Sequence, residues 1–234
     1  MGTLFLTHIP KTAGTSMRSS VVAPHVPEAG CHSPNGYYSA LSSRGSFDLI
    51  EGHFPYGMHY LYGVKNPSYF VMLRDPIDRA ISHYYFISAC DGPSYVHPRI
   101  EDVRENDLVG FYRKAEYQNM QTRFVAGLGW EYAGRYVSLD GWLGRWALSR
   151  AKRNLLEQYE AYGIKERFHD SAQLFATRLS ASADIPEKQH KKTPNRPDAS
   201  ELPDATVQEL RQLNALDVAL YRFASDHFDE QFDA

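Results

Sequence analysis

The chain is poor in cysteine and has no long apolar run. Its 234 residues include two cysteines, Cys31 and Cys90, which form no CxxC pair and no Cys/His cluster at zinc spacing. We therefore expect unpaired thiols in a reducing compartment. No window approaches the roughly 20 apolar residues that a membrane span needs, and the run Leu4-Phe5-Leu6 beside Met1 is too short for a signal peptide. These absences predict a cytoplasmic protein without stable membrane insertion.

A strong net charge is also absent. The formal net charge is -3, which argues against a general nucleic-acid or membrane-surface binder, so any anion site must be local. We found no internal repeat, low-complexity tract or domain boundary. With 43% hydrophobic residues, residues 1–234 are expected to form a single domain with a substantial core.

The stretch from Thr3 to Met17 predicts a strand, a tight loop and a helix start. A buried strand is indicated by Leu4-Phe5-Leu6, and a helix is expected over residues 16–22. The loop between them suits an anion because it offers close backbone N–H groups, one full positive charge and several hydroxyl donors. Its candidate residues are Lys11, Thr12, Ala13, Gly14, Thr15 and Ser16. No Gly-Lys-Ser/Thr ends the loop, so it is not a Walker A motif, and an ordinary strand-to-helix turn is the alternative.

A second candidate residue follows the short apolar run at residues 47–50. His53 stands after this predicted strand and after Gly52, where open α/β sheets bind ligands. Its imidazole is the side chain best suited to take a proton from a hydroxyl near neutral pH. A structural histidine in a turn is the alternative.

A third candidate region begins where a continuous apolar run ends. Residues 68–73 predict a central strand, and Asp75 and Pro76 are suited to the N-cap and first position of a helix reaching about residue 88. Arg74 offers a guanidinium fork for a phosphate, and Ser82 can add a hydroxyl from the same side. A surface ion pair between Arg74 and Asp78 is the alternative.

The remaining pattern predicts alternating helices and strands. Helices are expected over residues 108–124, 142–159, 168–179 and 202–228, with a short strand at 162–164. Residues 23–45 and 90–107 are predicted to be loops that shape an acceptor site. The order of elements specifies a parallel α/β sheet.

The segment His8-Ile9-Pro10-Lys11-Thr12-Ala13-Gly14-Thr15-Ser16 resembles the 5′-phosphosulfate loop of sulfotransferases that use 3′-phosphoadenosine 5′-phosphosulfate (PAPS), particularly the branch containing heparan sulfate 2-O-sulfotransferase. The resemblance implies a P-loop-like three-layer fold with a central parallel sheet flanked by helices. It also implies that His53 is the catalytic base and that Arg74 and Ser82 hold the 3′-phosphate. The family pattern has a second histidine two residues before His53, where this chain has Glu51, whose role stays open.

Two further segments resemble the family less closely. Residues 119–123 resemble a segment near the cleft, which makes Gln121 and Arg123 acceptor-site candidates; helix capping and surface charge are equally consistent with them. Residues 188–197 form a dense basic segment that either covers the nucleotide or is a solvated linker. There we carry over Lys191 and Thr193, although an Asn is common in the family where Lys191 stands.

The expected activity is transfer of the sulfuryl group of PAPS to a hydroxyl of a glycan, lipid or small molecule, leaving adenosine 3′,5′-bisphosphate. His53 would take the acceptor proton, and Lys11 with the loop would stabilise developing charge. No metal site is expected. A P-loop-type nucleotide kinase or NTPase and a non-catalytic nucleotide-binding protein are the alternatives. The sequence indicates neither the acceptor nor the oligomeric state.

Overall fold

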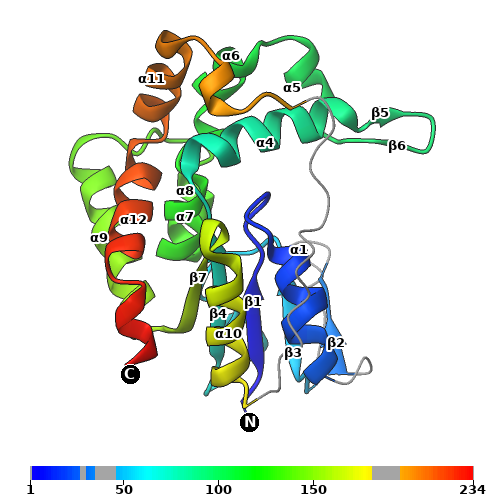
Figure 1. The fold of residues 1–234 in the computed structure, drawn as a ribbon, viewed down its shortest axis with the longest axis vertical. Helices are drawn as coiled ribbons and strands as arrows, with labels where there is room; N and C mark the ends of the chain where they lie inside the picture. The colour runs from blue at the N-terminus through cyan, green and yellow to red at the C-terminus, as the bar shows by residue number, and fades with distance from the viewer. Residues whose placement is uncertain (1, 27–29, 35–45, 181–195, 234) are drawn as a thin grey trace.

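Five parallel strands form the centre of the molecule, in the order β2-β3-β1-β4-β7 (Figure 1). The structure is a computed structural model and describes residues 2–26, 30–34, 46–180 and 196–233. The strands are β1 (Leu4–Thr7), β2 (Cys31–His32), β3 (Leu49–Gly52), β4 (Ser68–Leu73) and β7 (Tyr159–Ile164). The predicted α/β fold with a central parallel sheet flanked by helices is confirmed.

The central strands are apolar because both of their faces are covered. All four residues of β1 are buried, as are Tyr69 to Leu73 of β4. In the parallel register Leu6 lies between Glu51 of β3 and Phe70 of β4. The carboxyl ends of β1, β3, β4 and β7 therefore share one edge of the sheet.

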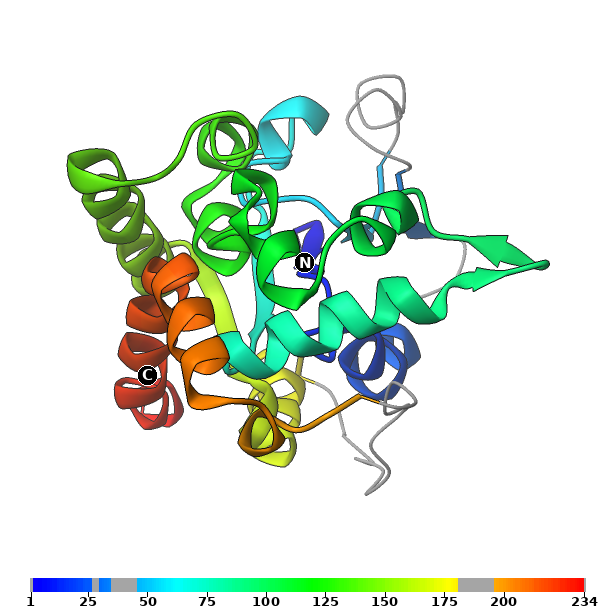
Figure 2. The ribbon, with the colours of Figure 1, turned by 90° about the horizontal axis from the view of Figure 1, so that it is seen from above.

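Helices cover both faces of the sheet (Figure 2). On one face lie α1 (Gly14–Met17), which continues as a π-helix over Arg18–Val22 and a 3₁₀ turn at Ala23–His25, and α10 (Phe168–Arg178). On the other lie α7 (Met120–Ala126), α8 (Leu128–Ala133) and α9 (Gly141–Glu157). The terminal α12 (Ala215–Asp226) packs on α9 and α7. Their apolar faces and the sheet form the main core.

A second layer lies beyond the carboxyl edge of the sheet. There α4 (Pro76–Ala89) runs across the molecule and packs with α5 (Ile100–Arg104), α6 (Leu108–Arg113) and α11 (Asp204–Leu213). This layer has its own apolar core, which includes Ile81, Phe111 and Leu210. As predicted, Asp75 caps α4, since its carboxylate accepts from the backbone N–H groups of Ile77 and Asp78 at 3.0 and 2.9 Å.

Two predicted long helices are each broken, and one pair of asparagines explains both breaks. The helix expected over residues 108–124 becomes α6, a 3₁₀ turn at Ala115–Tyr117 and α7, while that expected over 202–228 divides into α11 and α12. Asn119, with a left-handed φ of 50°, accepts from the Leu216 backbone N–H at 2.9 Å. Asn214 accepts from the Asn119 backbone N–H at 3.2 Å. Each break therefore satisfies the backbone groups of the other.

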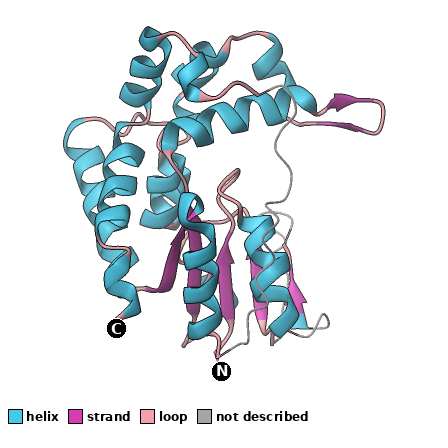
Figure 3. Cartoon of the chain, in the orientation of Figure 1, coloured by secondary structure: helices cyan, strands magenta, loops and turns pink. Residues whose placement is uncertain are grey.

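The described parts of the two predicted loops contain regular structure, so the prediction of loop throughout was wrong; their role in shaping an acceptor site stays a prediction. In residues 23–45 the described part holds the Ala23–His25 turn and β2, and residues 27–29 and 35–45 lie outside the described ranges. In residues 90–107 the hairpin of β5 (Asp91–Gly92) and β6 (Tyr95–Val96) projects from the end of α4 (Figure 3), and α5 follows it. The sequence reading also missed α3 (His59–Tyr62) and α8.

The remaining short elements are 3₁₀ turns at Lys165–Arg167, Ala199–Glu201 and Asp229–Phe232. Every helix within the described ranges is too short or too polar to traverse a bilayer. The same ranges contain no group of three or more His, Cys, Asp or Glu residues suited to a metal ion.

Candidate active site

A cavity of 690 Å³ lies at the carboxyl edge of the sheet, bordered by α4. Each of four strands delivers the residue that directly follows it to this cavity: His8 after β1, His53 after β3, Arg74 after β4 and Lys165 after β7. The predicted site residues that line it are Lys11, Ala13, Gly14, Thr15, Ser16, His53, Arg74, Ser82 and Arg123. The structure therefore brings together most of the residues that the sequence singled out.

The loop after β1 folds sharply around its own backbone. Lys11 and Ala13 have left-handed φ values of 70° and 71°, which non-glycine residues adopt at a cost and mostly at functional sites. Thr12 is fully buried, and its hydroxyl donates to the Ile9 carbonyl at 2.9 Å. Thr12 thus holds the loop in shape and does not line the cavity, whereas Thr15 and Ser16 do.

Gly14 is required by the close approach of the His8 ring. A Cβ atom on Gly14 would lie 2.4 Å from Cδ2 and 2.8 Å from Nε2 of His8. The His8 ring also packs against His53, with ring centroids 4.6 Å apart. Burial, helped by the positive charges of His53 and Lys11, lowers the pKa of His8 to about 4, so His8 is neutral at pH 7.

His53 is exposed to the cavity and has its tautomer set by the backbone. Its Nδ1 lies 2.6 Å from the His8 carbonyl oxygen. Because a carbonyl oxygen only accepts, Nδ1 carries the proton of the neutral ring, and the lone pair is on Nε2. The ring is therefore anchored on one side and basic on the other.

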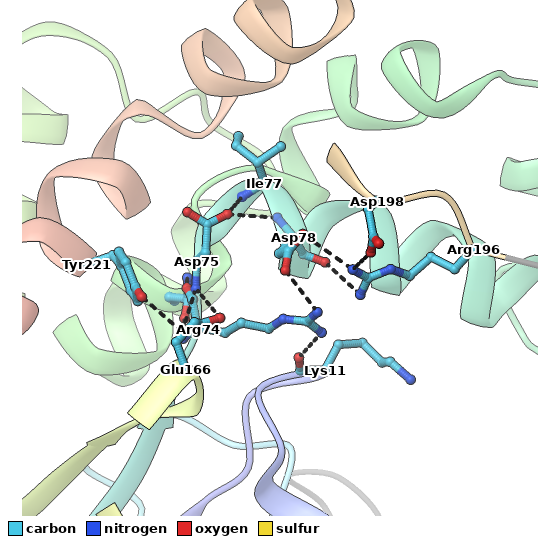
Figure 4. A network of polar contacts seen from close by, with 10 residues as sticks. Lys11, Arg74, Asp75, Ile77, Asp78, Glu166, Arg196, Asp198 and Tyr221 are labelled. Carbon is cyan, nitrogen blue, oxygen red and sulfur yellow. Dashed lines mark hydrogen bonds and ion pairs between the residues drawn. The ribbon is translucent and has the colours of Figure 1, made fainter. Parts of the chain in front are cut away.

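Arg74 is held in place by contacts to its backbone and side chain (Figure 4). The Gln121 side chain accepts from the Arg74 N–H and donates to the Arg74 carbonyl, both at 2.9 Å. The guanidinium donates to the Lys11 carbonyl at 3.1 Å and pairs with Asp78 at 3.5 Å. Its Nε is buried and has no hydrogen-bond partner among the described residues. Burial and then the charge of Arg196 lower the pKa of Arg74.

Lys11 and Ser82 complete this side of the cavity. The Lys11 ammonium lies 4.2 Å above the Phe86 ring, a cation–π contact. Burial and then the Arg74 charge lower the pKa of Lys11. Ser82 of α4 is 3% exposed and lines the cavity. The alternative was right that Arg74 pairs with Asp78, but Arg74 and Ser82 are both buried, so Arg74 is not at the surface and the Ser82 hydroxyl is not solvated.

Sequence reasoning missed several cations of the site. Lys165 was not proposed, although the strand expected over residues 162–164 ends directly before it, as β7 does. Burial and then the Arg74 charge lower the pKa of Lys165. Arg196, only part of the predicted basic segment, forms an ion pair with Asp78 at 3.3 Å (Figure 4). Asp78 therefore stands between the guanidinium groups of Arg74 and Arg196.

The wall opposite the loop is built around Arg123. This residue is 2% exposed, and its Nη1 donates to the carbonyls of Ala115, Glu116 and Gln118 at 3.3, 2.8 and 3.2 Å. It also forms a buried ion pair with Glu131 at 3.7 Å. Arg123 thus ties α7 to the turn before it while lining the cavity.

The other candidate residues lie elsewhere. Gln121 is 1% exposed, and its amide is engaged by the Arg74 backbone. Glu51 is buried, pairs with Arg18 and accepts from the Ser33 hydroxyl at 3.0 Å. Neither residue is among those that line the cavity. The predicted nucleotide contacts Lys191 and Thr193 fall outside the described residues.

The chain belongs to the sulfotransferase family, whose sequence model it matches over residues 3–224. The family expected from the sequence is thereby confirmed. Among its relatives are heparan sulfate 2-O-sulfotransferase 1 of Gallus gallus and of Homo sapiens, each 29% identical over 143 residues. Heparin sulfate O-sulfotransferase of Drosophila melanogaster is 27% identical over 141 residues. These alignments cover 56% of this chain and 37 to 38% of the relatives, so the chain spans under two fifths of their length.

Proposed function

We propose that the protein transfers the sulfuryl group of PAPS to a hydroxyl of a glycan, lipid or small-molecule acceptor, with His53 as general base. One observation carries the proposal. One cavity is lined by the His53 imidazole, whose Nε2 carries a lone pair, by the loop that contains Lys11, and by the buried guanidinium of Arg74. Those groups match a ligand with acidic groups at two ends, one of which carries the group to be transferred.

The cavity fits the donor in size and in chemistry. Its 690 Å³ lies within the range of small-molecule sites, about 300–1,000 Å³. The buried Nε of Arg74 is a donor without a described partner, and such a group costs roughly 1–3 kcal/mol until an acceptor reaches it. A phosphate oxygen is such an acceptor. Arg74 and Ser82 would hold the 3′-phosphate, and Lys11 with the amides of Ala13 to Thr15 would hold the phosphosulfate.

The chain's own residues account for the proton and for the charge. When bound, the donor supplies an activated sulfuryl group whose transfer leaves adenosine 3′,5′-bisphosphate. His53 Nε2 would accept the hydroxyl proton while the His8 carbonyl holds the ring. Lys11 and Lys165 would stabilise negative charge that develops on the leaving phosphate. Neutral His8 adds no competing positive charge beside the base.

One alternative function needs features that the described residues do not present, and the other leaves a feature of the cavity without a role. A P-loop kinase or NTPase uses a Gly-Lys-Ser/Thr loop ending and a strand-terminal Asp for metal. Here β4 is followed by Arg74, and the Asp75 carboxylate after it caps α4. A nucleotide-binding protein without catalysis has no need of an anchored, exposed imidazole in the cavity. Neither alternative gains support from a specific observation.

Binding and transfer are tested separately. Calorimetry should show that adenosine 3′,5′-bisphosphate binds tightly and ATP weakly, and a sulfate-transfer assay over a panel of hydroxyl acceptors should then detect turnover. His53→Ala should reduce kcat by about 10²–10⁴ and leave the Kd of the bisphosphate within about twofold. His169→Ala, in the exposed part of α10, is the matched control. Equal losses of binding and turnover in His53→Ala would refute the base assignment.

A further inference from the structure

All three tryptophans of the chain gather on one surface, formed by α8 and α9. The ring centroids of Trp130 and Trp146 lie 5.4 Å apart at 80°, and those of Trp142 and Trp146 lie 6.2 Å apart at 27°. Trp142 and Trp146 are 62% and 59% exposed. Large aromatic side chains grouped in the open mark a binding surface more often than they serve the fold.

A second hollow, of 270 Å³, opens at this surface. Its walls are the rings of Tyr56, Tyr60, Trp130 and Trp146, the backbone around Gly127 and the Arg150 side chain. We call it the tryptophan groove. It is separate from the catalytic cavity: on α7 and α8, Arg123 and Glu131 line the cavity, whereas residues 126–130 line the groove. The α7–α8 segment therefore has a binding hollow on each side.

The groove is flanked by a line of side chains along α9. Trp142, Trp146 and Arg150 are spaced four residues apart, so they follow one face of the helix at intervals of about 6 Å. Arg150 is exposed and forms no ion pair with any described residue. Of the four basic residues of α9, Arg150 lines the groove, whereas Lys152 lies over the Phe223 ring of α12. The two indole rings are thus followed along the helix by the positive charge of Arg150.

We propose that the tryptophan groove binds an anionic oligosaccharide, with sugar rings on Trp146 and Trp142 and an acidic group on Arg150. A sugar ring has a flat C–H face that buries against an indole ring, while its hydroxyl and acidic groups stay in water or meet a cation. The groove is a hollow lined by residues of four helices, α3, α7, α8 and α9, whereas an amphipathic helix that binds a bilayer lies in the plane of the interface with one apolar face buried. This proposal does not depend on the proposed transferase activity, because binding requires neither donor nor turnover.

Tryptophan fluorescence reports this site directly, since no tryptophan lies elsewhere in the chain. Titration of the full chain with tetragalacturonate, without donor, should shift or quench the emission saturably, and neutral maltotetraose should bind at least tenfold more weakly. Trp146→Ala should weaken tetragalacturonate binding at least tenfold, measured by calorimetry, while Trp146→Phe keeps most of it. Arg150→Gln should remove the preference for the acidic saccharide. Tyr95→Ala, an exposed aromatic on the β5–β6 hairpin, is the matched control and should bind normally.

Several outcomes would overturn the proposal. Unchanged emission at millimolar tetragalacturonate would do so, as would equal binding of the neutral and acidic saccharides. Self-association in ultracentrifugation that Trp146→Ala abolishes would assign the surface to a second copy of the chain. Binding to vesicles of anionic phospholipid, lost in Trp146→Ala, would assign it to a membrane. Because Trp146 is exposed, its variants should unfold at the wild-type temperature, and bisphosphate binding at the catalytic cavity should be intact in all of them.

Discussion

Replacing Gly14 by alanine tests how closely the loop and the candidate base are packed. The added Cβ would stand 2.4, 2.8 and 3.0 Å from three atoms of the His8 ring, too close for any real contact. A rigid ring wedged against His53 yields less easily than the end of a flexible side chain. Overpacking of this kind costs typically about 1–3 kcal/mol. In a chain of this length each kcal/mol lowers Tm by roughly 2–4 °C, so Gly14→Ala should lower Tm by about 2–12 °C.

A double variant isolates the cause. In the His8→Ala background the ring is gone, and adding Gly14→Ala should then cost less than about 0.5 kcal/mol; thermal unfolding of the four proteins yields the coupling energy. Gly129→Ala is the control, since a Cβ at this exposed helical position meets nothing within 4 Å. If Gly14→Ala were equally costly with and without the His8 ring, the steric reasoning would be wrong.

Three further predictions concern pH, the cavity wall and the phosphate site. The pKa of His8 is about 4 in the folded chain and 6.5 in the unfolded chain, so the unfolded chain binds more protons between these values. Roughly 3 kcal/mol of stability present above pH 6.5 should therefore be lost as the pH falls through 4. In urea unfolding from pH 7 to 4, the free energy of unfolding should depend less on pH in His8→Gln than in the wild type. Glu131→Gln removes the carboxylate that pairs with the buried Arg123 and should cost about 3–5 kcal/mol, and an unchanged urea midpoint would exclude this role for the pair. Arg74→Lys loses the guanidinium fork and should weaken adenosine 3′,5′-bisphosphate binding by about tenfold or more in calorimetry. Ser82→Ala removes one neutral hydrogen bond and should weaken this binding by about 2- to 12-fold. A larger loss in Ser82→Ala than in Arg74→Lys would refute the assignment of the main phosphate contact to Arg74.

The local pattern of the sequence was enough to predict what depends on neighbours along the chain. The apolar run of β4, the Asp75 cap and the loop that ends at Gly14 are each determined within about ten residues, and all were predicted correctly. From them followed the α/β fold and the idea that His53 and Arg74 stand at strand ends. Their roles in donor binding and proton transfer stay predictions.

What the sequence did not reveal depends on partners far apart in the chain. The breaks at Asn119 and Asn214 satisfy each other across 95 residues, which no helical pattern can indicate. Glu51 forms an ion pair with Arg18, and its position two residues before the candidate base did not indicate this partner. Gln121 likewise supports Arg74 from 47 residues away. Gln121 and Glu51 were both considered for the acceptor site, whereas in the structure they hold the Arg74 backbone and pair with Arg18.

Four residues of the cavity directly follow adjacent strands of the sheet, whereas the rest of its lining does not. His8, His53, Arg74 and Lys165 inherit their spacing from the hydrogen-bonded ladder of the sheet, whereas residues 97–135 contribute the facing wall from separate short helices and turns. Under the proposed function, replacing residues 97–135 should change the acceptor preference and leave the position of the donor unchanged. One side of the cavity is thus fixed by the sheet, and the other side can change without altering the sheet.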